Sequence, residues 1–585
     1  MNIGNFERFD NHSHSMFSNF RLIDSINRPK DMILKAYELG MKGIALTDHE
    51  TVAGHVEWLK SEKELKAAGK IPEDFKCACG NEIYLVDDRN NIERYWHYIL
   101  IAKDTVGHRA LRELSSIAWY NGFSSRGLYR VPTEKKELEQ IVHKYPNSLI
   151  ATTGCLGGEL PHFVAELVKA EKKGDEFDVY AWKMKIDNFI RWNLDLFGED
   201  FYIEIAAASS KDQIKFNKRV VSIAAAYNIK IVIGSDAHYL TSKERPVHKA
   251  YLNSKDGERE VDDFYTYSHM MDNIEAFEYL KDSDFTEEDF KNFCDNSMEI
   301  YNKIGTYDIF RKPIIPRVDV KDYPKSDPPF TWKELYPTLT YLLNSDNIQE
   351  RYWVNECLNA ICEKHLESEQ YFTALETEAR VIKVVGEKLG NCLYEYFNTF
   401  QHMINLFWEC GSIVGPGRGS AVCFLSNYLL GITQLDPLQW GLKYWRFLNE
   451  ERVELPDIDI DLTPSKRKKV FEALRKERGE LNVIQVCTYG TEGTRSAIAA
   501  ACRGYRSEFY PDGIEIETSQ YLSSLIPQER GFLWSIHDAV YGNPEKERQP
   551  IAALVNELNK YPGLLEIIES IEGSKKKLAL KHLFH

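Results

Sequence analysis

Short apolar runs alternate with helical patterns along the N-terminal half of the chain. Helical periodicity covers 28–40, with Pro29 in its first turn, and 54–67. Helices between successive strands are typical of β/α architecture. Several runs end in polar residues of metal-binding type, which favours a barrel whose functional site lies at one face of the strands. The strands predicted in this way are 43–46, 81–85, 97–102, 148–151, 201–205 and 230–234.

The C-terminal half has longer helical patterns and one segment with a period of two. In Asp457 to Asp461, carboxylates alternate with isoleucines, which is the pattern of a strand. Residues two apart share a face, so Asp459 and Asp461 are expected to project side by side. The helices predicted in this half are 332–388, 394–410, 421–430, 464–478 and 494–503, and 483–486 is predicted to be a short strand.

Two carboxylates that project side by side repel each other, and a cation between them removes that cost. Paired divalent metals at such positions catalyse phosphoryl and nucleotidyl transfer. An Asp-Ile-Asp-Ile-Asp strand by itself is also consistent with a structural calcium ion. The pair Asp459 and Asp461 is therefore a candidate catalytic site, with calcium binding as the alternative.

A glycine-rich turn, Gly415-Pro416-Gly417-Arg418-Gly419-Ser420, precedes the aspartates and the predicted helix 421–430. Glycines let backbone N–H groups approach a phosphate, and the N-terminus of the following helix would add positive charge. Arg418 and Ser420 offer a guanidinium and a hydroxyl. A glycine loop alone is a weak signal, since most such loops are ordinary turns.

The segments GPGRGSA, ITQLDPL, RFLNEERV and PDIDID together resemble the palm of the bacterial and phage C-family DNA polymerases, the DNA polymerase III alpha subunits. The resemblance implies a nucleotidyltransferase-like α+β palm in which Asp459 and Asp461 hold two Mg²⁺ ions, with Asp457 in a supporting role. It also implies an inserted helical thumb. The residues it assigns to phosphate and nucleotide binding are Gly417, Arg418, Gly419, Ser420, Arg446 and Arg452.

Histidines and carboxylates near the ends of the N-terminal strands resemble, in order, the metal ligands of the polymerase and histidinol phosphatase (PHP) family. That family implies a distorted seven-stranded β/α barrel that binds up to three ions, with Zn²⁺, Mn²⁺ or Fe²⁺ suited to imidazole and thiolate ligands. Each residue alone could be an ordinary core residue. Asn19 or water is an alternative to Asp24. The matching residues are His12, His14, Asp24, His49, Glu82, His97, Cys155, Asp236 and His238.

The remaining cysteines and histidines give no metal signal of their own. Cys77-Ala78-Cys79 has no second pair at zinc-finger spacing, so both cysteines are expected to be structural. His55, His108, His162 and His248 are expected to lie beside the metal ligands or on the surface. Eleven cysteines without a framework spacing indicate reduced thiols.

Composition narrows the class of protein further. A chain of 585 residues is long enough for three or four domains. No apolar run reaches the length of a membrane span and no signal sequence opens the chain, so a cytoplasmic protein is expected. A net charge of −16 argues against a protein that coats DNA nonspecifically. Between Leu462 and Arg506, however, basic residues exceed acidic ones, ten against four. This segment is either a surface beside the catalytic site or a solvated helix face.

The two resemblances agree, since PHP domains precede C-family palms, and they imply an α/β multidomain protein. The expected domains are the barrel at 1–270, the first part of the palm with connecting helices at 271–490, the thumb at 491–568, and the start of the returning palm at 569–585. The family carries a third catalytic aspartate beyond this point. We therefore expect the N-terminal portion of a replicative DNA-directed DNA polymerase.

The expected partners are primer-template DNA, dNTPs and a C-terminal polymerase portion or partner chain, with a sliding clamp bound only through missing regions and no membrane. Two alternatives stay open at this point. The chain could be a stand-alone PHP 3′–5′ exonuclease or phosphoesterase, because its barrel ligand set is complete. It could also be a non-catalytic module that a partner chain completes.

Overall fold

The computed structural model describes the chain except residues 1, 21, 126–127, 255–264, 487 and 577–585. The chain divides into two compact units, one formed by 1–310 with 487–585 and the other by 311–486. The four domains predicted from the sequence stay a prediction, and most of the segment expected to return to the palm, with His585 at its end, lies outside the described residues.

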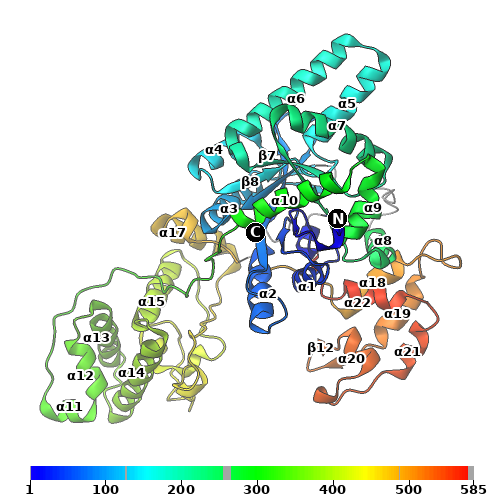
Figure 1. Cartoon of the computed structure of the whole chain (residues 1–585). Helices are drawn as coiled ribbons and strands as arrows, with labels where there is room; N and C mark the ends of the chain where they lie inside the picture. The colour runs from blue at the N-terminus through cyan, green and yellow to red at the C-terminus, as the bar shows by residue number, and fades with distance from the viewer. Residues whose placement is uncertain (1, 21, 126–127, 255–264, 487, 577–585) are drawn as a thin grey trace. The chain divides into compact units, whose positions relative to one another are not determined.

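A twisted sheet forms the centre of the first unit (Figure 1). All neighbouring strands on its main path are parallel except β4, which is antiparallel to both of its neighbours. A backbone bridge between Ser13 and Ala237, with the N–H of His14 3.0 Å from the Ala237 oxygen, joins the segments that follow the two end strands. The order is β1 (Phe9–Asp10), β2 (Gly43–Leu46), β3 (Lys76–Val86), β4 (Trp96–Ala102), β8 (Leu149–Thr152), β9 (Phe201–Ala206) and β10 (Lys230–Gly234), with β7 (Thr133–Glu134) beside β3.

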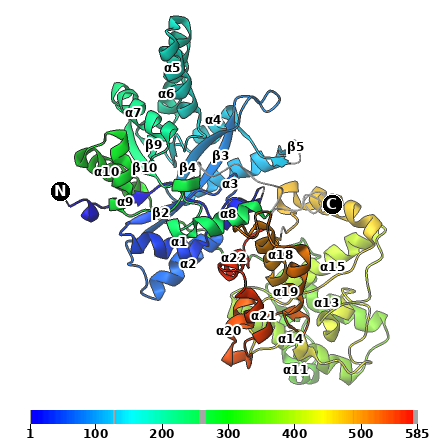
Figure 2. The ribbon, with the colours of Figure 1, turned by 90° about the vertical axis from the view of Figure 1, so that its right-hand side faces the viewer.

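This near-closed sheet confirms the predicted distorted seven-stranded barrel, and all six predicted strands are present. Alternate side chains enter two different cores, as the pleat of a strand requires. Ala45, Ala78 and Ile99 pack in the inner core, whereas Ile44 and Cys79 pack against helices outside. The outer helices, which surround the sheet in Figure 2, are α1 (Pro29–Glu38), α2 (His55–Ala67), α3 (Thr105–Tyr120), α4 (Lys135–Lys144), α5 (Glu159–Lys173), α6 (Glu176–Phe197), α7 (Lys211–Tyr227), α9 (Asn273–Leu280) and α10 (Glu287–Lys303).

The C-terminal helices of the first unit pack against α8 (Arg245–Asn253), which follows the last barrel strand. α18 (Thr494–Gly504) crosses α8 so closely that a Cβ on Gly504 would lie 1.8 Å from the carbonyl oxygen of Ala250. The Tyr251 hydroxyl lies 3.0 Å from that of Ser574 and ties the same helix to the chain beyond α22. The other helices of this group are α19 (Ile516–Ser524), α20 (Ile536–Tyr541), α21 (Ala552–Leu558) and α22 (Leu564–Ile571).

The second unit is built mainly from helices around one apolar core. It confirms the predicted helical segments 332–388, 394–410 and 464–478, and α18 in the first unit confirms 494–503. The helices of this unit are α11 (Phe330–Leu335), α12 (Pro337–Asn344), α13 (Ile348–Glu363), α14 (Glu369–Leu389), α15 (Tyr394–Glu409), α16 (Leu425–Leu429) and α17 (Arg467–Arg478).

Three predicted elements of this region are wrong. The helix predicted over 421–430 is a 3-10 turn, η7 (Ala421–Cys423), and then the five-residue α16, because Phe424 is extended between them. The strands predicted at 457–461 and 483–486 are irregular, since within the described part of 311–486 no partner strand pairs with them. An isolated antiparallel bridge joins Val414 to Leu462.

The alternation predicted for the aspartate segment nevertheless holds. Ile458 is buried, whereas Asp457, Asp459 and Asp461 are exposed. Across the described residues, every helix is too short or too polar to span a lipid bilayer.

The contact at Gly504 predicts a strong effect of one added methyl group. Gly504→Ala should lower the free energy of unfolding by about 1–3 kcal/mol, because the methyl group overpacks against the backbone of α8. Gly493→Ala, at the N-cap of the same helix, places the new Cβ more than 4 Å from every described neighbour and should cost less, because only the capping preference for glycine over alanine is lost. Denaturant unfolding of both variants checks this, and equal losses of stability would contradict the packing described for α18 and α8.

Candidate metal centre and aspartate segment

One end of the barrel gathers the predicted metal ligands. His12 and His14 follow β1, His49 follows β2, and Asp236 and His238 follow β10. Parallel strands end at the same edge of a barrel, so the residues after them meet there. The antiparallel β4 begins at this edge and brings His97, near its start, to the same place. The remaining predicted ligands are Asp24 in the loop after η2 (Met16–Phe20), Glu82 in β3 and Cys155 after β8.

The carboxylate of Glu82 lies at the centre of the cluster and is fully buried. Its Oε1 is 2.5 Å from His97 Nδ1, and its Oε2 is 2.8 Å from His49 Nδ1, 3.2 Å from His14 Nε2 and 3.6 Å from His12 Nε2. Among the described residues, none of these approaches has hydrogen-bond geometry, so both oxygens lack a donor. A buried carboxylate without donors is costly unless a cation compensates it. The donor set therefore fits metal ions.

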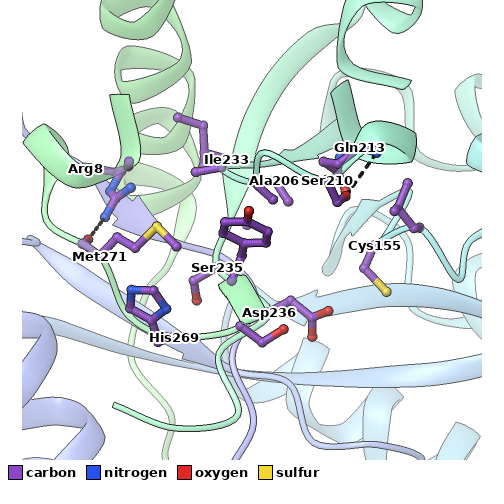
Figure 3. Close-up of a pocket in the computed structure, with 17 residues that line it drawn as sticks. Arg8, Cys155, Ala206, Ser210, Gln213, Ile233, Ser235, Asp236, His269 and Met271 are labelled. Atoms are coloured by element: carbon purple, nitrogen blue, oxygen red, sulfur yellow. Dashed lines mark hydrogen bonds between the residues drawn. The ribbon is translucent and has the colours of Figure 1, made fainter. Parts of the chain in front are cut away.

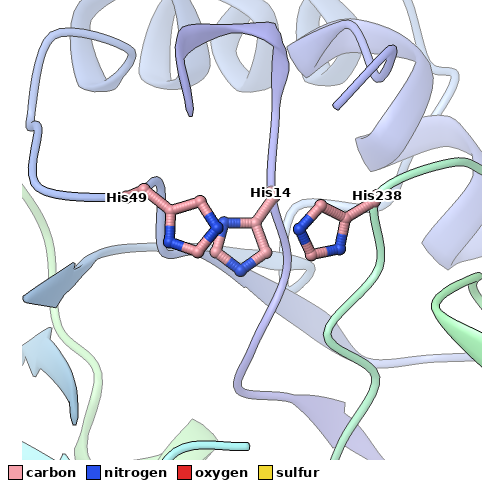
Figure 4. Close-up of side chains that lie close together, drawn as sticks. All are labelled: His14, His49 and His238. Atoms are coloured by element: carbon pink, nitrogen blue, oxygen red, sulfur yellow. The ribbon is translucent and has the colours of Figure 1, made fainter. Parts of the chain in front are cut away.

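The imidazoles around Glu82 form a compact stack. His14 lies between His49 and His238, with ring centroids 4.2 and 4.5 Å away and nearly parallel planes (Figure 4). The Nε2 atoms of His12 and His14 face each other at 3.0 Å. Ligand atoms within 4.8 Å of one another form three overlapping groups: His12, His14, Glu82 and Asp236; His14, His49 and His238; and His49, Glu82 and His97.

Asp24 and Cys155 border these groups. Asp24 Oδ2 lies 2.7 Å from His49 Nε2 and 2.9 Å from His238 Nε2. Cys155 Sγ lies 3.5 Å from His97 Nδ1. Asn19, the alternative to Asp24, has its side chain engaged in bracing the loop: it donates to the Ser25 carbonyl at 2.8 Å and accepts the N–H groups of Asp24 and Ser25.

Glu204 is a functional residue that the sequence reasoning missed. Its Oε1 lies 2.5 Å from His12 Nδ1, while its Oε2 accepts bonds from Asn11 and Thr152. A carboxylate on the far nitrogen of a ligating histidine fixes the ring and directs its other nitrogen toward a metal. A Cβ at Gly234 would lie 2.3 Å from Glu204 Oε1, so this position has room only for glycine. The available signal was a glutamate inside the apolar strand Phe201–Ala206.

Burial and neighbouring charges shift the pKa values of Glu82, His12 and Asp236. Burial alone would raise the pKa of Glu82, but His97 and His49 outweigh it and hold that pKa well below its usual value. Burial would also lower the pKa of His12, yet Glu204 and Asp236 raise it well above normal. Asp236 behaves like Glu82, and its neighbouring histidines bring its pKa to about 2. The carboxylates of Glu82 and Asp236 therefore stay ionised, and a metal ion that binds here displaces a proton from His12.

Two pockets give access to the cluster and share Asp236. One has a volume of about 460 Å³ and is lined by His49, His97, Tyr84 and Tyr265 among others. The second has a volume of about 640 Å³. Figure 3 shows Arg8 and His269 on one side of it, Cys155 on the other and Asp236 at its base. Several of the predicted ligands thus line these pockets, whereas Glu82 does not.

The second unit brings the glycine loop and the aspartates together. Arg418 lies between the two carboxylates, 3.9 Å from Asp459 Oδ2 and 3.4 Å from Asp461 Oδ1. The N–H of Gly415 donates to the Asp461 carbonyl at 3.0 Å. Gly417 and Gly419 have φ of +133° and +63°, which favour glycine, and a Cβ on Gly419 would lie 3.2 Å from Asp459 Oδ2. The side-by-side aspartates and the neighbouring loop of the sequence analysis are therefore present.

Two expected features of this loop are wrong. Among the described residues after the loop, η7 and the five-residue α16 stand in place of the expected long helix, so no strong helix dipole points at the turn. The first N–H groups of α16, from Leu425 and Ser426, donate instead to the buried carboxylate of Glu378 at 2.6 and 2.8 Å.

In the described structure, the two arginines predicted to bind the nucleotide make their contacts outside the glycine loop. Arg452 pairs with Glu454, and Arg446 is exposed at the end of η8 (Tyr444–Arg446). Within the described residues, neither has an ion pair or hydrogen bond to the loop or to Asp459 and Asp461. Their predicted role stays a prediction.

The basic segment is divided between the two units. The seven basic residues from Lys466 to Arg478 belong to the unit that carries the aspartates, and four of them are exposed. The later arginines belong to the other unit, where Arg495 donates to the Ser523 carbonyl and Arg503 to that of Ser254. The first part, which includes α17, carries its charge within the aspartate unit.

A barrel of this topology, with histidines and carboxylates gathered at one strand edge, is the arrangement of the PHP class. Residues 10–208 match the family model of the PHP domain, and residues 343–582 match that of the bacterial DNA polymerase III alpha NTPase domain. The chain therefore combines a PHP domain with the NTPase domain of the bacterial DNA polymerase III alpha family.

Curated relatives agree with both matches. The chain is 38% identical over 592 residues to a probable DNA polymerase, YorL, of Bacillus subtilis (strain 168), and to a DNA-directed DNA polymerase of Bacillus phage SPbeta with the same figures. It is 29% identical over 560 residues to the DNA polymerase III subunit alpha of Aquifex aeolicus (strain VF5). These alignments cover 97%, 97% and 92% of this chain but 44%, 44% and 42% of the relatives, so the chain spans less than half of their length.

The position of Glu204 predicts how the centre is held. Glu204→Gln should weaken metal affinity by about 10–100-fold, because His12 loses the carboxylate that orients its ring. Titration of the metal-depleted chain with Mn²⁺, followed by calorimetry, measures this. Glu159→Gln is the matched control, since Glu159 is a buried glutamate that pairs with Lys135 and is absent from the candidate metal groups. Unchanged affinity in Glu204→Gln would contradict the role given to Glu204.

Proposed function

We propose that this chain is the N-terminal part of a replicative DNA-directed DNA polymerase, and that its barrel is a metal-dependent 3′–5′ exonuclease. The observation that carries the proposal is the buried Glu82 carboxylate, which four imidazole nitrogens surround, beside predicted ligands that line two pockets. The family matches and the curated relatives support the polymerase part.

In the barrel, the proposed ligands of up to three Zn²⁺, Mn²⁺ or Fe²⁺ ions are the nine residues of the sequence analysis. Such ions, when bound, polarise a phosphodiester and lower the pKa of water that attacks it. Glu82 and Asp236 each approach more than one imidazole, so they are suited to hold adjacent ions at a short separation. Glu204 keeps His12 oriented.

The pockets suggest how a DNA end reaches the centre. Arg8 and His269 line the larger pocket opposite Cys155. Arg8 is buried and donates one N–H to the Met271 carbonyl, while its Nε has no acceptor among the described residues. A buried guanidinium with an unused donor is suited to a phosphate oxygen. A 3′-terminal nucleotide in this pocket would have its phosphate between Arg8 and Asp236.

In the second unit, Asp459 and Asp461 are proposed to hold Mg²⁺ for nucleotidyl transfer from dNTPs to a primer. Two-metal sites of this kind stabilise the attacking and leaving oxygens. Arg418 now lies between both carboxylates and offsets part of their charge, and it would turn toward the triphosphate when cations take its place. Gly417, Gly419 and Ser420 are proposed to approach the phosphates, with Arg446 and Arg452 further along the nucleotide.

A C-terminal polymerase portion or partner chain is proposed to complete the polymerase site, and it would bring the sliding-clamp contact. A stand-alone phosphoesterase is the second candidate function. It is favoured by one observation: all nine proposed barrel ligands belong to the first unit, whose centre needs no residue of the aspartate unit. A cytoplasmic location stays a prediction.

The exonuclease proposal predicts a selective loss of activity. His49→Ala and Cys155→Ser should each abolish release of nucleotides from a 5′-labelled single-stranded oligonucleotide in Mn²⁺, because both side chains border the proposed metal positions. Asp459→Asn should leave the rate unchanged, since that residue belongs to the other unit. Gel analysis of the shortened products gives the rates.

A contaminating nuclease would be insensitive to all three changes. Loss of activity in Asp459→Asn with full activity in His49→Ala would place the nuclease in the aspartate unit and contradict the proposal.

The nucleotidyl-transfer site predicts a local metal position. With Fe²⁺, a dNTP, ascorbate and peroxide, hydroxyl radicals should cut the backbone near 415–420 and 457–461. Asp459→Asn and Asp461→Asn should remove these cuts and keep those in the barrel. Asp319→Asn is the matched control, because Asp319 is an exposed aspartate of the same unit that lies outside both segments. Mass spectrometry of the fragments locates the cuts, and cuts that survive loss of both aspartates would contradict the assignment.

A further inference from the structure

A second cluster of metal-ligand side chains lies outside the barrel centre. His55 begins α2, Cys79 lies in β3 and His108 lies in the first turns of α3. Their exposed fractions are 1%, 0% and 3%, and one ligand atom of each lies within 4.8 Å of the others. The prediction that these histidines lie beside the barrel ligands or on the surface is therefore wrong. They are buried between the sheet and its covering helices.

This cluster is separated from the barrel centre by the sheet itself. Side chains alternate along β3, so Cys79 and Glu82, three residues apart, project to opposite faces. Cys79 packs in the outer core with Ile44 and Trp58, whereas Ala78 belongs to the inner core. The three residues of the cluster share no member with the groups around Glu82.

The hydrogen bonds of His55 direct one nitrogen into the cluster. Its Nε2 lies 2.8 Å from the carbonyl oxygen of Gly80, so Nε2 carries the proton and donates it. Nδ1 then has a free lone pair, and it is buried without a partner among the described residues. A ring whose far N–H bonds a backbone carbonyl is the usual arrangement of a metal-ligating histidine.

His108 supplies a second observation. Both of its ring nitrogens are buried, and neither has a hydrogen-bond partner in the described structure. An unsatisfied buried polar atom destabilises the folded chain, and this cluster contains three such nitrogens. Burial lowers the pKa of His55 to about 3 and that of His108 to about 4, so both rings are neutral near pH 7 and their lone pairs can bind a cation.

We propose that His55 Nδ1, Cys79 Sγ and a ring nitrogen of His108 bind a Zn²⁺ ion. Two neutral imidazoles and one thiolate suit zinc, and water would fill the fourth tetrahedral position. Binding replaces the thiol proton of Cys79, which leaves to solvent, by the Zn–S bond. The ion would fasten α2 and α3 to β3, the strand that also carries Glu82. This site goes beyond the proposed nuclease and polymerase functions and does not depend on them.

Cobalt spectroscopy can detect the site because a thiolate bound to Co²⁺ gives a charge-transfer band in the near ultraviolet. The parent protein is the full chain with Cys155→Ser, a change that removes the thiol of the barrel centre. It is produced in minimal medium supplemented with cobalt, because a buried site must bind its metal while the chain folds. We expect the band in this parent. Adding Cys79→Ser should abolish it and reduce bound metal by about one equivalent per chain.

Cys77→Ser is the matched control, because Cys77 is buried on the same face of β3 two residues earlier and is absent from the cluster. The Cys77→Ser variant should keep both the charge-transfer band and the bound cobalt. If circular dichroism shows that the Cys79→Ser variant is unfolded, His108→Gln takes its place. This variant keeps the Cys79 thiol and should still lose or shift the charge-transfer band. A folded parent without the band, or a band that survives Cys79→Ser, overturns the proposal and leaves a buried water as the partner of the histidines.

Discussion

The structure of the first unit depends on the compensation of one buried charge. Glu82 has no exposed surface, yet four imidazole nitrogens approach its carboxylate at 2.5–3.6 Å without hydrogen-bond geometry. Protonated histidines can balance the charge in part, as the raised pKa of His12 indicates. Metal ions balance it better, because they satisfy carboxylate and imidazole lone pairs at once.

Several features of the barrel serve this arrangement. The reversed direction of β4 brings the start of that strand, with His97, to the edge where the parallel strands end. Glu204 holds His12 from one side, and a glycine at 234 makes room for it. On the outer face of the same β3 strand, Cys79 and two histidines form a second buried cluster. β3 therefore connects the two candidate metal sites, and its position matters to both.

The sequence predicted the barrel well because apolar strand runs and ligand types at their ends are local signals. It missed Glu204, which acts only through contacts with His12 and Thr152 that are distant in sequence. It also placed His55 and His108 wrongly, since their burial depends on how α2 and α3 pack. In the second unit, the period of two correctly placed the aspartates on one face. The same period wrongly predicted a β-strand. A strand needs a second strand to pair with, and a local sequence pattern does not show whether one is present.

Anomalous diffraction from crystals of the full chain grown with Mn²⁺ tests the central claim most directly. Data collected at the manganese edge should show two or three peaks among the nine barrel ligands, with at least one peak bonded to Glu82. Ordered water in place of every peak, with the Glu82 carboxylate bonded only to protonated histidines, would contradict the account of a multinuclear metal centre.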